Sequence, residues 1–339
     1  MHDPLGTGDR MRRREFLALL GGATFVAPPA ARAQQPERVR RLGVLMGVLA
    51  TSPASQQQAE ALRQSLHGLG WTEGRNIRID YRWGAYDPGR AQPLAKEIAA
   101  QQPDVIIALA TEAVEAILHE TRDIPLVFVN LSDPVGRGFI KSLARPGGNI
   151  TGFTNFENSM GGKWLEVLKE IAPQTSRVGL LFGSDARPMA PYLHSVQDAA
   201  GSFAVEVITI SAHDTADIEN GIVSLAREPH AGLVVMPHLF TGVNSAFIIN
   251  STAEHRLSAV YPYSFFAKAG GLVSYGIDAV EQFRRTAAYV DRILRGAKAG
   301  ELPVQAPTKF ELVINLKTAK ALGVNVPLHL QQVADEVIE

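Results

Sequence analysis

Short apolar runs of strand length alternate with amphipathic stretches of helical period along most of this chain. The first run, 41–46, is followed by apolar residues spaced three and four apart, as on one face of a helix, which are Ala59, Leu62, Leu66 and Leu69. Further runs predict strands at 76–83, 104–109, 124–129, 177–182, 205–210, 232–236, 259–261, 272–275 and 310–314. Strands that alternate with helices in this way favour an α/β fold with a parallel sheet covered on both faces.

The predicted helices fill the intervals between these strands. Beyond the first, their ranges are 93–100, 112–120, 135–144, 163–171, 188–200, 217–226, 244–255 and 280–294, with a short one that ends at 322. Two successive α/β runs meet at Pro146, Gly147 and Gly148, and 339 residues are enough for two domains of typical size. We therefore expect two doubly wound parallel-sheet lobes, with the chain leaving the first lobe at this turn.

The N-terminus has the pattern of an export signal. Three arginines at 12–14 precede an apolar run at 16–27, and an Ala-x-Ala site ends at Ala33. The run is shorter than the about 20 apolar residues that a membrane-spanning helix needs. The arginines match a twin-arginine signal only in part, so twin-arginine and general secretory export both stay open, as do Met1 and Met11 as the start. We expect a signal peptide cleaved after Ala33 and a periplasmic protein.

Composition excludes several classes of function. The formal net charge is −1, which gives no electrostatic reason to expect nucleic-acid binding. The chain has no cysteine, and this removes disulfides, thiolate catalysis and cysteine-based zinc sites together.

Motifs that carry catalytic chemistry are incomplete in this sequence. The stretch 271–276 approaches a G-x-S-x-G elbow, but its first glycine is one place too early. The stretch 161–164 lacks the Ser/Thr of a phosphate loop, and 136–138 lacks the third glycine of a dinucleotide fingerprint. We expect no catalytic residue, no metal and no cofactor, while an exported hydrolase that uses Ser132 or Ser274 remains an alternative because triads form in space rather than in sequence.

Polar residues follow the predicted strands at their carboxyl ends, the edge where open α/β sheets bind ligands. In the first run these residues are Ser52, Ser55, Thr111, Ser132 and Asp133. In the second run they are Ser184 and Asp185, His238, and Tyr263 and Ser264. The pattern across both runs predicts a small-molecule site that both lobes share.

Each of these residues also has a purely structural explanation. Asp133 stands before Pro134, which suits the N-cap and first position of a helix, so capping alone would explain it. Thr111 would likewise cap a helix at 112–120. His238 follows a proline and would be a satisfied loop histidine, and Phe182 would be an ordinary core residue.

Four stretches resemble a known family along nearly all of residues 40–339. They are "SDPVGRGFIKSLARPGGNITGF", "AGGLVSYGID", "RRTAAYVDRILRGAKAGELPVQAPTKFELVINLKTAKALGVNVP" and "ADEVIE". They are similar to the ABC transporter substrate-binding proteins of the tryptophan/tyrosine type. The resemblance implies a type I periplasmic binding fold, in which two α/β lobes joined by three crossovers hold a ligand between them without catalysis.

This resemblance also implies a domain layout and a partner. We expect an export signal at 1–33, a first lobe at 38–150 and 276–305, and a second lobe at 151–275 and 306–339. The crossovers fall near 149–153, 270–277 and 305–309, where glycines and prolines suit a hinge or a fixed path. The partner is an ABC permease of the inner membrane, and the protein itself is expected to be a monomer. A receptor that feeds a signalling partner is an alternative that no residue excludes.

Residue chemistry narrows the ligand only slightly. Ser and Thr at helix N-termini hold carboxylates, and Asp133 or Asp278 could pair with an ammonium group. Aromatic residues that could stack on a flat apolar group are Phe156, Phe182, Tyr263 and Tyr275. We therefore expect an amino acid or related carboxylate with an apolar or aromatic side chain.

Overall fold

The computed structural model describes residues 38–47, 50–51, 53–84, 87–155, 157, 159–184 and 189–339. Within this part of the chain, the first of two sheets has five parallel strands in the order β2-β1-β3-β4-β5. Their bounds are β1 Arg40–Met46, β2 Ile77–Trp83, β3 Val105–Leu109, β4 Leu126–Leu131 and β5 Ile150–Thr154. The predicted α/β alternation is therefore confirmed for this half of the chain.

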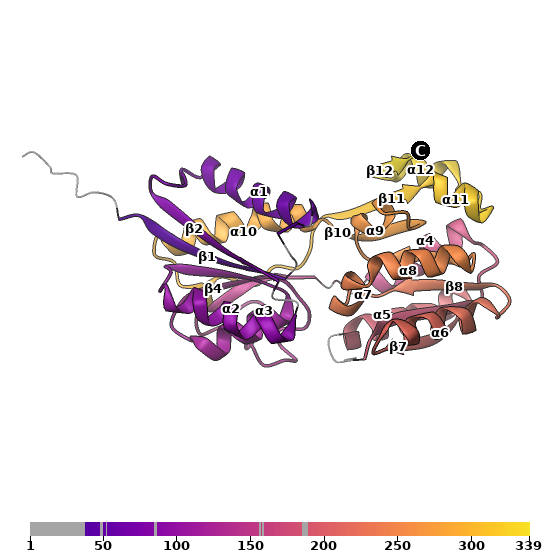
Figure 1. Cartoon of the computed structure of the whole chain (residues 1–339), viewed down its shortest axis with the longest axis horizontal. Helices are drawn as coiled ribbons and strands as arrows, with labels where there is room; N and C mark the ends of the chain where they lie inside the picture. The colour runs from indigo at the N-terminus through magenta and orange to yellow at the C-terminus, as the bar shows by residue number, and fades with distance from the viewer. Residues whose placement is uncertain are drawn as a thin grey trace, which may run out of the picture. The chain divides into compact units, whose positions relative to one another are not determined.

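Helices cover both faces of the first sheet (Figure 1). Leu42, Val44 and Met46 of β1 pack with α1 (Pro53–Gly68) and α10 (Ala279–Leu294). Leu45 points to the opposite face, where α2 (Pro88–Ala100) and α3 (Ala110–Glu120) lie. Alternate side chains of a strand point to opposite faces, so one apolar run supplies two cores. We call this sheet and these four helices the first lobe.

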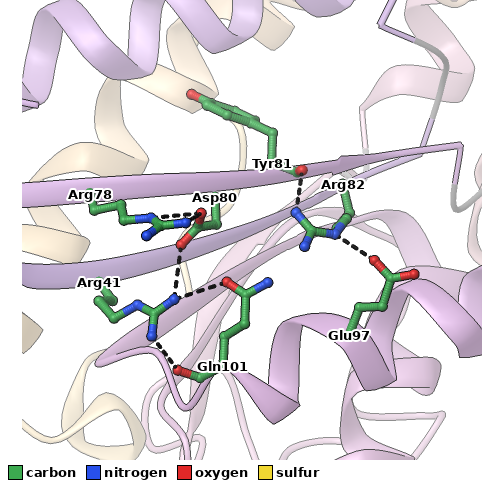
Figure 2. A network of polar contacts seen from close by, with 7 residues as sticks. All are labelled: Arg41, Arg78, Asp80, Tyr81, Arg82, Glu97 and Gln101. Atoms are coloured by element: carbon green, nitrogen blue, oxygen red, sulfur yellow. Dashed lines mark hydrogen bonds and ion pairs between the residues drawn. The ribbon is translucent and has the colours of Figure 1, made fainter.

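A polar network ties the end of α2 to the first two strands (Figure 2). Arg41 donates to the Gln101 backbone carbonyl at 3.0 Å and to the Gln101 side chain at 3.1 Å, and it pairs with Asp80 at 3.5 Å. Arg82 on β2 pairs with Glu97 on α2 at 2.7 Å. Arg41 lies at the amino end of β1, and Arg82 joins β2 to the helix that covers it, so these contacts hold the scaffold together.

The second sheet has the strand order β12-β11-β10-β9-β8-β6-β7. Its strands are β6 Arg177–Gly183, β7 Glu206–Ala212, β8 Ala231–Val235, β9 Ser258–Tyr261, β10 Val273–Ile277, β11 Phe310–Asn315 and β12 Glu336–Ile338. The neighbours are parallel except β10 and β11. The single antiparallel pair arises because β11 enters the sheet from the first lobe, against the direction of β10.

Helices also cover both faces of the second sheet. One face carries α4 (Met160–Ile171) and α5 (Ala190–Ala200), with α11 (Leu316–Leu322) and α12 (Leu328–Val333) beside them. The other carries α6 (Thr215–Ala226), α8 (Ser245–Glu254) and α9 (Ser264–Lys268), and α7 (Leu239–Val243) lies at the end of β8. Short 3-10 turns include η2 (Gly201–Phe203) and η3 (Ala299–Glu301). We call this sheet and its helices the second lobe.

Three segments connect the lobes and bond to one another. The Thr154 amide donates to the Gln305 carbonyl at 2.9 Å, and the Asp278 amide donates to the Lys309 carbonyl at 3.1 Å. Gln282 Nε2 on α10 donates to the Thr154 carbonyl at 2.7 Å. The three crossovers of a type I periplasmic binding fold are thus present as one bonded bundle of chain.

Two local expectations differ from the structure. Residues 135–144 form successive turns instead of a helix, because Gly136 and Gly138 disfavour a helix and Gly138 has a φ of +74°. The turn at Gly147 and Gly148 does not lead out of the first lobe, since β5 after it pairs with β4. The turn instead admits a close approach, in which the Gly147 amide donates to the Gly300 carbonyl at 3.0 Å.

The predicted export signal at 1–33 lies outside the described residues, as do Ser52, Phe156 and Asp185. In the part of the chain that is described, every helix is too short or too polar to cross a membrane.

Candidate functional site

A cavity of about 570 Å³ lies where the carboxyl ends of strands from both sheets meet. Its volume is within the range of roughly 300–1,000 Å³ that small-molecule sites occupy. The first lobe contributes the starts of α1 and α3 and the ends of β4 and β5. The second lobe contributes the segments after β8 and β9, the end of β10 and one residue of β11.

The wall from the first lobe presents helix N-termini and an unsatisfied hydroxyl. Ser55, in the first turn of α1, is 0% exposed, and its Oγ has no hydrogen-bond partner among the described residues. Gln58 Oε1, one turn further, is also buried without a hydrogen-bond partner among the described residues. At α3 the N-cap is Leu109, whose side chain cannot cap. Backbone N–H groups at such helix starts attract anions.

Left-handed backbone occurs at two residues of this wall. Ala110, at the start of α3, has a φ of +71°, and Asn130, near the end of β4, has a φ of +58°. Both residues line the cavity. A left-handed conformation costs a residue other than glycine about 1–2 kcal/mol, and such strain collects at functional sites.

Polar side chains of the two lobes meet at one end of the cavity. Ser132 Oγ donates to Asn155 Oδ1 at 3.0 Å, and Tyr192 Oη of α5 donates to the Asn155 carbonyl at 2.9 Å. Tyr263 Oη lies 3.4 Å from both Asn130 Nδ2 and Asn130 Oδ1. Burial raises the pKa of Tyr263, while its hydrogen bonds act in the other direction, so the phenol stays protonated and can donate.

The wall from the second lobe is largely apolar and aromatic. The rings of Tyr263 and Phe265 stack with centroids 5.9 Å apart and planes 13° apart. His238 Nδ1 accepts from the Phe240 amide at 3.1 Å, so Nε2 carries the proton in the neutral ring. Its ring packs over Gly183, where a Cβ would lie 2.5 Å from His238 Cε1. These three rings line the cavity, and a planar apolar group could pack against them.

Both lobes contribute charged residues to the cavity. Among the described residues the charged side chains that line it are Glu112, Lys268 and Glu311. Lys268 Nζ pairs with Glu336 Oε2 at 2.9 Å. A second cavity of about 610 Å³ shares Gln57, Val280 and Glu311 with the first.

Comparison with known proteins decides the family. The model of the "ABC transporter substrate binding protein" family matches residues 44–338. The chain belongs to this family. Its members are substrate-binding proteins and not enzymes, which agrees with the lack of a complete catalytic motif in the sequence.

Relatives of this family are similar over most of their length. A protein named tyrosine-binding protein from Clostridioides difficile is 26% identical over 275 residues, which is 81% of this chain and 79% of that protein. A crystal structure of a conserved domain protein from Vibrio cholerae is 25% identical, with a TM-score of 0.81 over 88% of this chain and 100% of that one.

Two further solved structures share the fold. The structure of an "ABC domain in complex with L-Trp" from Streptococcus pneumonia is 22% identical, with a TM-score of 0.80 over 88% of this chain and 99% of that one. The ligand-free, open structure of a substrate-binding protein with adhesive properties from Clostridium difficile is 24% identical, with a TM-score of 0.70 over 89% of this chain and 99% of that one. The predicted type I periplasmic binding fold is confirmed.

The structure brings some of the predicted site residues together. Those that line the cavity are Ser55, Thr111, Ser132, His238 and Tyr263. Thr111 is the second residue of α3 and does not cap it, whereas His238 caps α7 as well as facing the cavity. Ser52 and Phe156 lie outside the described residues.

The remaining predicted residues lie elsewhere. Asp133 closes a turn by accepting from the Gly136 amide at 2.9 Å, and it does not line the cavity. It caps no helix, because residues 135–144 form turns. Phe182 is 3% exposed in the core of the second lobe, and Ser184 is exposed with its amide bonded to the Ala212 carbonyl. Tyr275 stacks on Phe310 with centroids 5.7 Å apart.

Asp278 also lies outside the cavity. It is 3% exposed, caps α10 by accepting from the Glu281 amide at 2.8 Å, and binds Lys309 Nζ at 2.8 Å. It lines the second cavity only.

Several cavity residues were not expected from the sequence. They are Gln58, Asn130, Asn155, Met189, Phe265 and Glu311. Asn155 directly follows β5, so the same rule of polar residues after strand ends could have found it. Glu311 gives no such signal, because it lies within a strand that reaches the cavity only through the crossover of the chain.

The described residues contain no metal site and no exposed catalytic serine. They hold no group of three or more His, Asp or Glu side chains placed to bind a metal. Ser132 donates to an asparagine, and Ser274 is 0% exposed in β10. The hydrolase alternative therefore has no support in the residues that it named.

Proposed function

We propose that this protein is the periplasmic solute-binding component of an ABC importer, and that it binds an amino acid with an aromatic or apolar side chain in the cavity between its lobes. The family supports the role, and two relatives named or crystallised with tyrosine and tryptophan support the ligand class. The cavity has a matching chemistry, with polar groups at one wall and stacked rings at the other.

The observation that carries this proposal is the unpartnered Ser55 hydroxyl in the first turn of α1. A buried hydroxyl without a partner costs about 1–3 kcal/mol, so it is retained where a ligand supplies the missing bond. Together with the N–H groups at the starts of α1 and α3, Ser55 and Thr111 would hold the ligand carboxylate.

The rest of the ligand would lie between the lobes. Its ring would cover the stacked Tyr263 and Phe265, beside His238. Ser132 would act through Asn155, which it orients by a hydrogen bond. Contacts from both lobes would favour a closed arrangement, with the three connecting segments as the hinge.

Export and transport follow from the same proposal. The sequence pattern at 1–33 supports an exported precursor that is cleaved after Ala33. The mature protein would be a periplasmic monomer that delivers its ligand to an ABC permease of the inner membrane.

A thermal-shift screen of the mature chain, 34–339, tests the proposal. The ligands are the common amino acids and small organic acids, with the D-isomers as controls. A ligand at 100 times its Kd stabilises the folded state by about 2.7 kcal/mol, which raises Tm by several degrees. We expect this for L-tryptophan or L-tyrosine. A screen in which organic acids stabilise the protein and no amino acid does would overturn the ligand class.

A further inference from the structure

The ligand cavity carries more negative than positive charge. Glu112 and Glu311 line it, and Lys268 is the one lysine or arginine among the described residues that does so. The Lys268 ammonium already pairs with Glu336, which does not line the cavity. A cationic group on the ligand would therefore enter a favourable field, whereas the carboxylate must rely on helix N-termini and hydroxyl groups.

Glu311 has an unusual position among these charges. It lies on β11 opposite Gly276 of β10, on the segment that has just crossed from the first lobe. It lines both the ligand cavity and the second cavity. The groups that face it are Ser264 and Lys268 of α9, Asp278 at the start of α10, and Lys309.

The surroundings leave the Glu311 carboxylate poorly compensated. Burial, followed by the negative charge of Asp278, raises the pKa of the Glu311 carboxyl, although Ser264, Lys268 and Lys309 act in the other direction. The Lys309 ammonium is bound by Asp278 at 2.8 Å and Lys268 by Glu336 at 2.9 Å. A half-buried carboxylate in this state gains more from a new cation than a well-paired one does.

Glu112 is in a different situation. It lies in the first turn of α3, where the helix dipole stabilises a negative charge. It also borders the N–H groups that suit an anion, so an ammonium group at Glu112 would face the positive end of the helix. Of the two acidic side chains that line the cavity, Glu311 is therefore the one whose surroundings favour a bound cation.

We propose that Glu311 binds the cationic amino group of the ligand and so selects α-amino acids over the corresponding carboxylic acids. This assignment rests on the proposed function. With the carboxylate at α1 and α3 of the first lobe and the amino group at Glu311 of the second, the ligand would join the two lobes by its own two charges.

Isothermal titration calorimetry of the mature chain at pH 7.5 tests this assignment with three probes. They are L-tryptophan, indole-3-propionate, which lacks the amino group, and tryptamine, which lacks the carboxylate. Wild type should bind L-tryptophan more tightly than indole-3-propionate. Glu311→Gln should weaken L-tryptophan binding roughly 10- to 100-fold, the range of one charge-assisted hydrogen bond, and leave indole-3-propionate unchanged or improved.

Matched variants separate this role from general effects. Glu254→Gln removes an exposed charge of the second lobe that is outside the cavity and should change neither affinity. Glu311→Asp keeps the charge and should retain part of the preference for the amino acid, which also tests the assignment if Glu311→Gln does not fold. Equal L-tryptophan affinity in wild type and Glu311→Gln, or loss of the preference in Glu112→Gln instead, would overturn the assignment alone. Failure of wild type to bind any of the three probes would overturn the assignment and the proposed function together.

Discussion

The buried Ser55 hydroxyl is expected to lower the stability of the ligand-free protein. Its hydroxyl is fully buried at the start of α1 without a partner among the described residues. Ser55→Ala removes the unsatisfied group, so the free energy of unfolding of the ligand-free protein should stay the same or rise by about 1 kcal/mol. The same change should weaken ligand binding about tenfold. Urea denaturation and calorimetry measure the two effects, and a destabilised variant with unchanged affinity would contradict a ligand role for Ser55.

Glu311 gives the ligand-free protein a pH dependence of definite sign. Burial and the charge of Asp278 raise its pKa in the folded state above the unfolded value of about 4.3. The folded state therefore binds this proton more tightly than the unfolded state does. The free energy of unfolding then falls as pH rises from the unfolded pKa through the raised pKa of the folded state.

Glu311→Gln should accordingly raise the Tm of the empty protein at pH 7.5 and leave it nearly unchanged at pH 4. The carboxyl is half-buried, so the gain is about 1 kcal/mol or less. Scanning calorimetry at the two pH values checks this. A variant that is less stable at pH 7.5 would show that the Glu311 carboxylate stabilises the ligand-free fold, and would contradict this prediction.

Asp133 closes a turn where a helix cap was expected. It closes a turn through the Gly136 amide, with a φ of +44°, outside the cavity. Asp133→Ala should therefore cost about 0.5–1.5 kcal/mol of stability, and Asp133→Asn less, with ligand affinity unchanged in both. A tenfold loss of affinity in folded Asp133→Asn would return Asp133 to the site.

At the scale of elements, α10 is positioned by a capping group that also binds a connecting segment. Asp278 is buried, caps α10 and holds Lys309 at 2.8 Å. Asp278→Ala removes both contacts and should cost about 1–3 kcal/mol of stability. Asp278→Asn keeps the cap and should cost about half as much. Urea denaturation distinguishes these values, and equal stability of Asp278→Ala and wild type would contradict this role.

Most of the elements, and fewer of their ends, could be predicted from the sequence. The buried strands β1, β3 and β6 are continuous apolar runs, and α10 carries an apolar stripe, so their periodicity is unambiguous. The segment 135–144 has the same apolar spacing, yet Gly136 and Gly138 favour turns there. Local glycine conformations outweighed a weak helical period.

At the scale of the whole molecule, several cavity residues that follow strands could be predicted from the sequence, whereas those that arrive by long-range topology could not. Thr111 and Tyr263 follow β3 and β9, so the rule for parallel sheets brings them to the cavity. Tyr192 meets Asn155 because α5 packs near the first crossover, and Glu311 reaches the cavity because β11 enters the second sheet antiparallel. Such contacts depend on how distant segments pack, which no local pattern encodes.

We propose that one cavity, built from both lobes, binds an amino acid with an aromatic or apolar side chain. A crystal structure of the mature protein grown with L-tryptophan or L-tyrosine tests it most directly. Ligand density is expected with the carboxylate at the starts of α1 and α3, beside Ser55, and the ring against Tyr263 and Phe265. Density for the amino acid at another place on the protein, with the cavity holding only solvent, would contradict it.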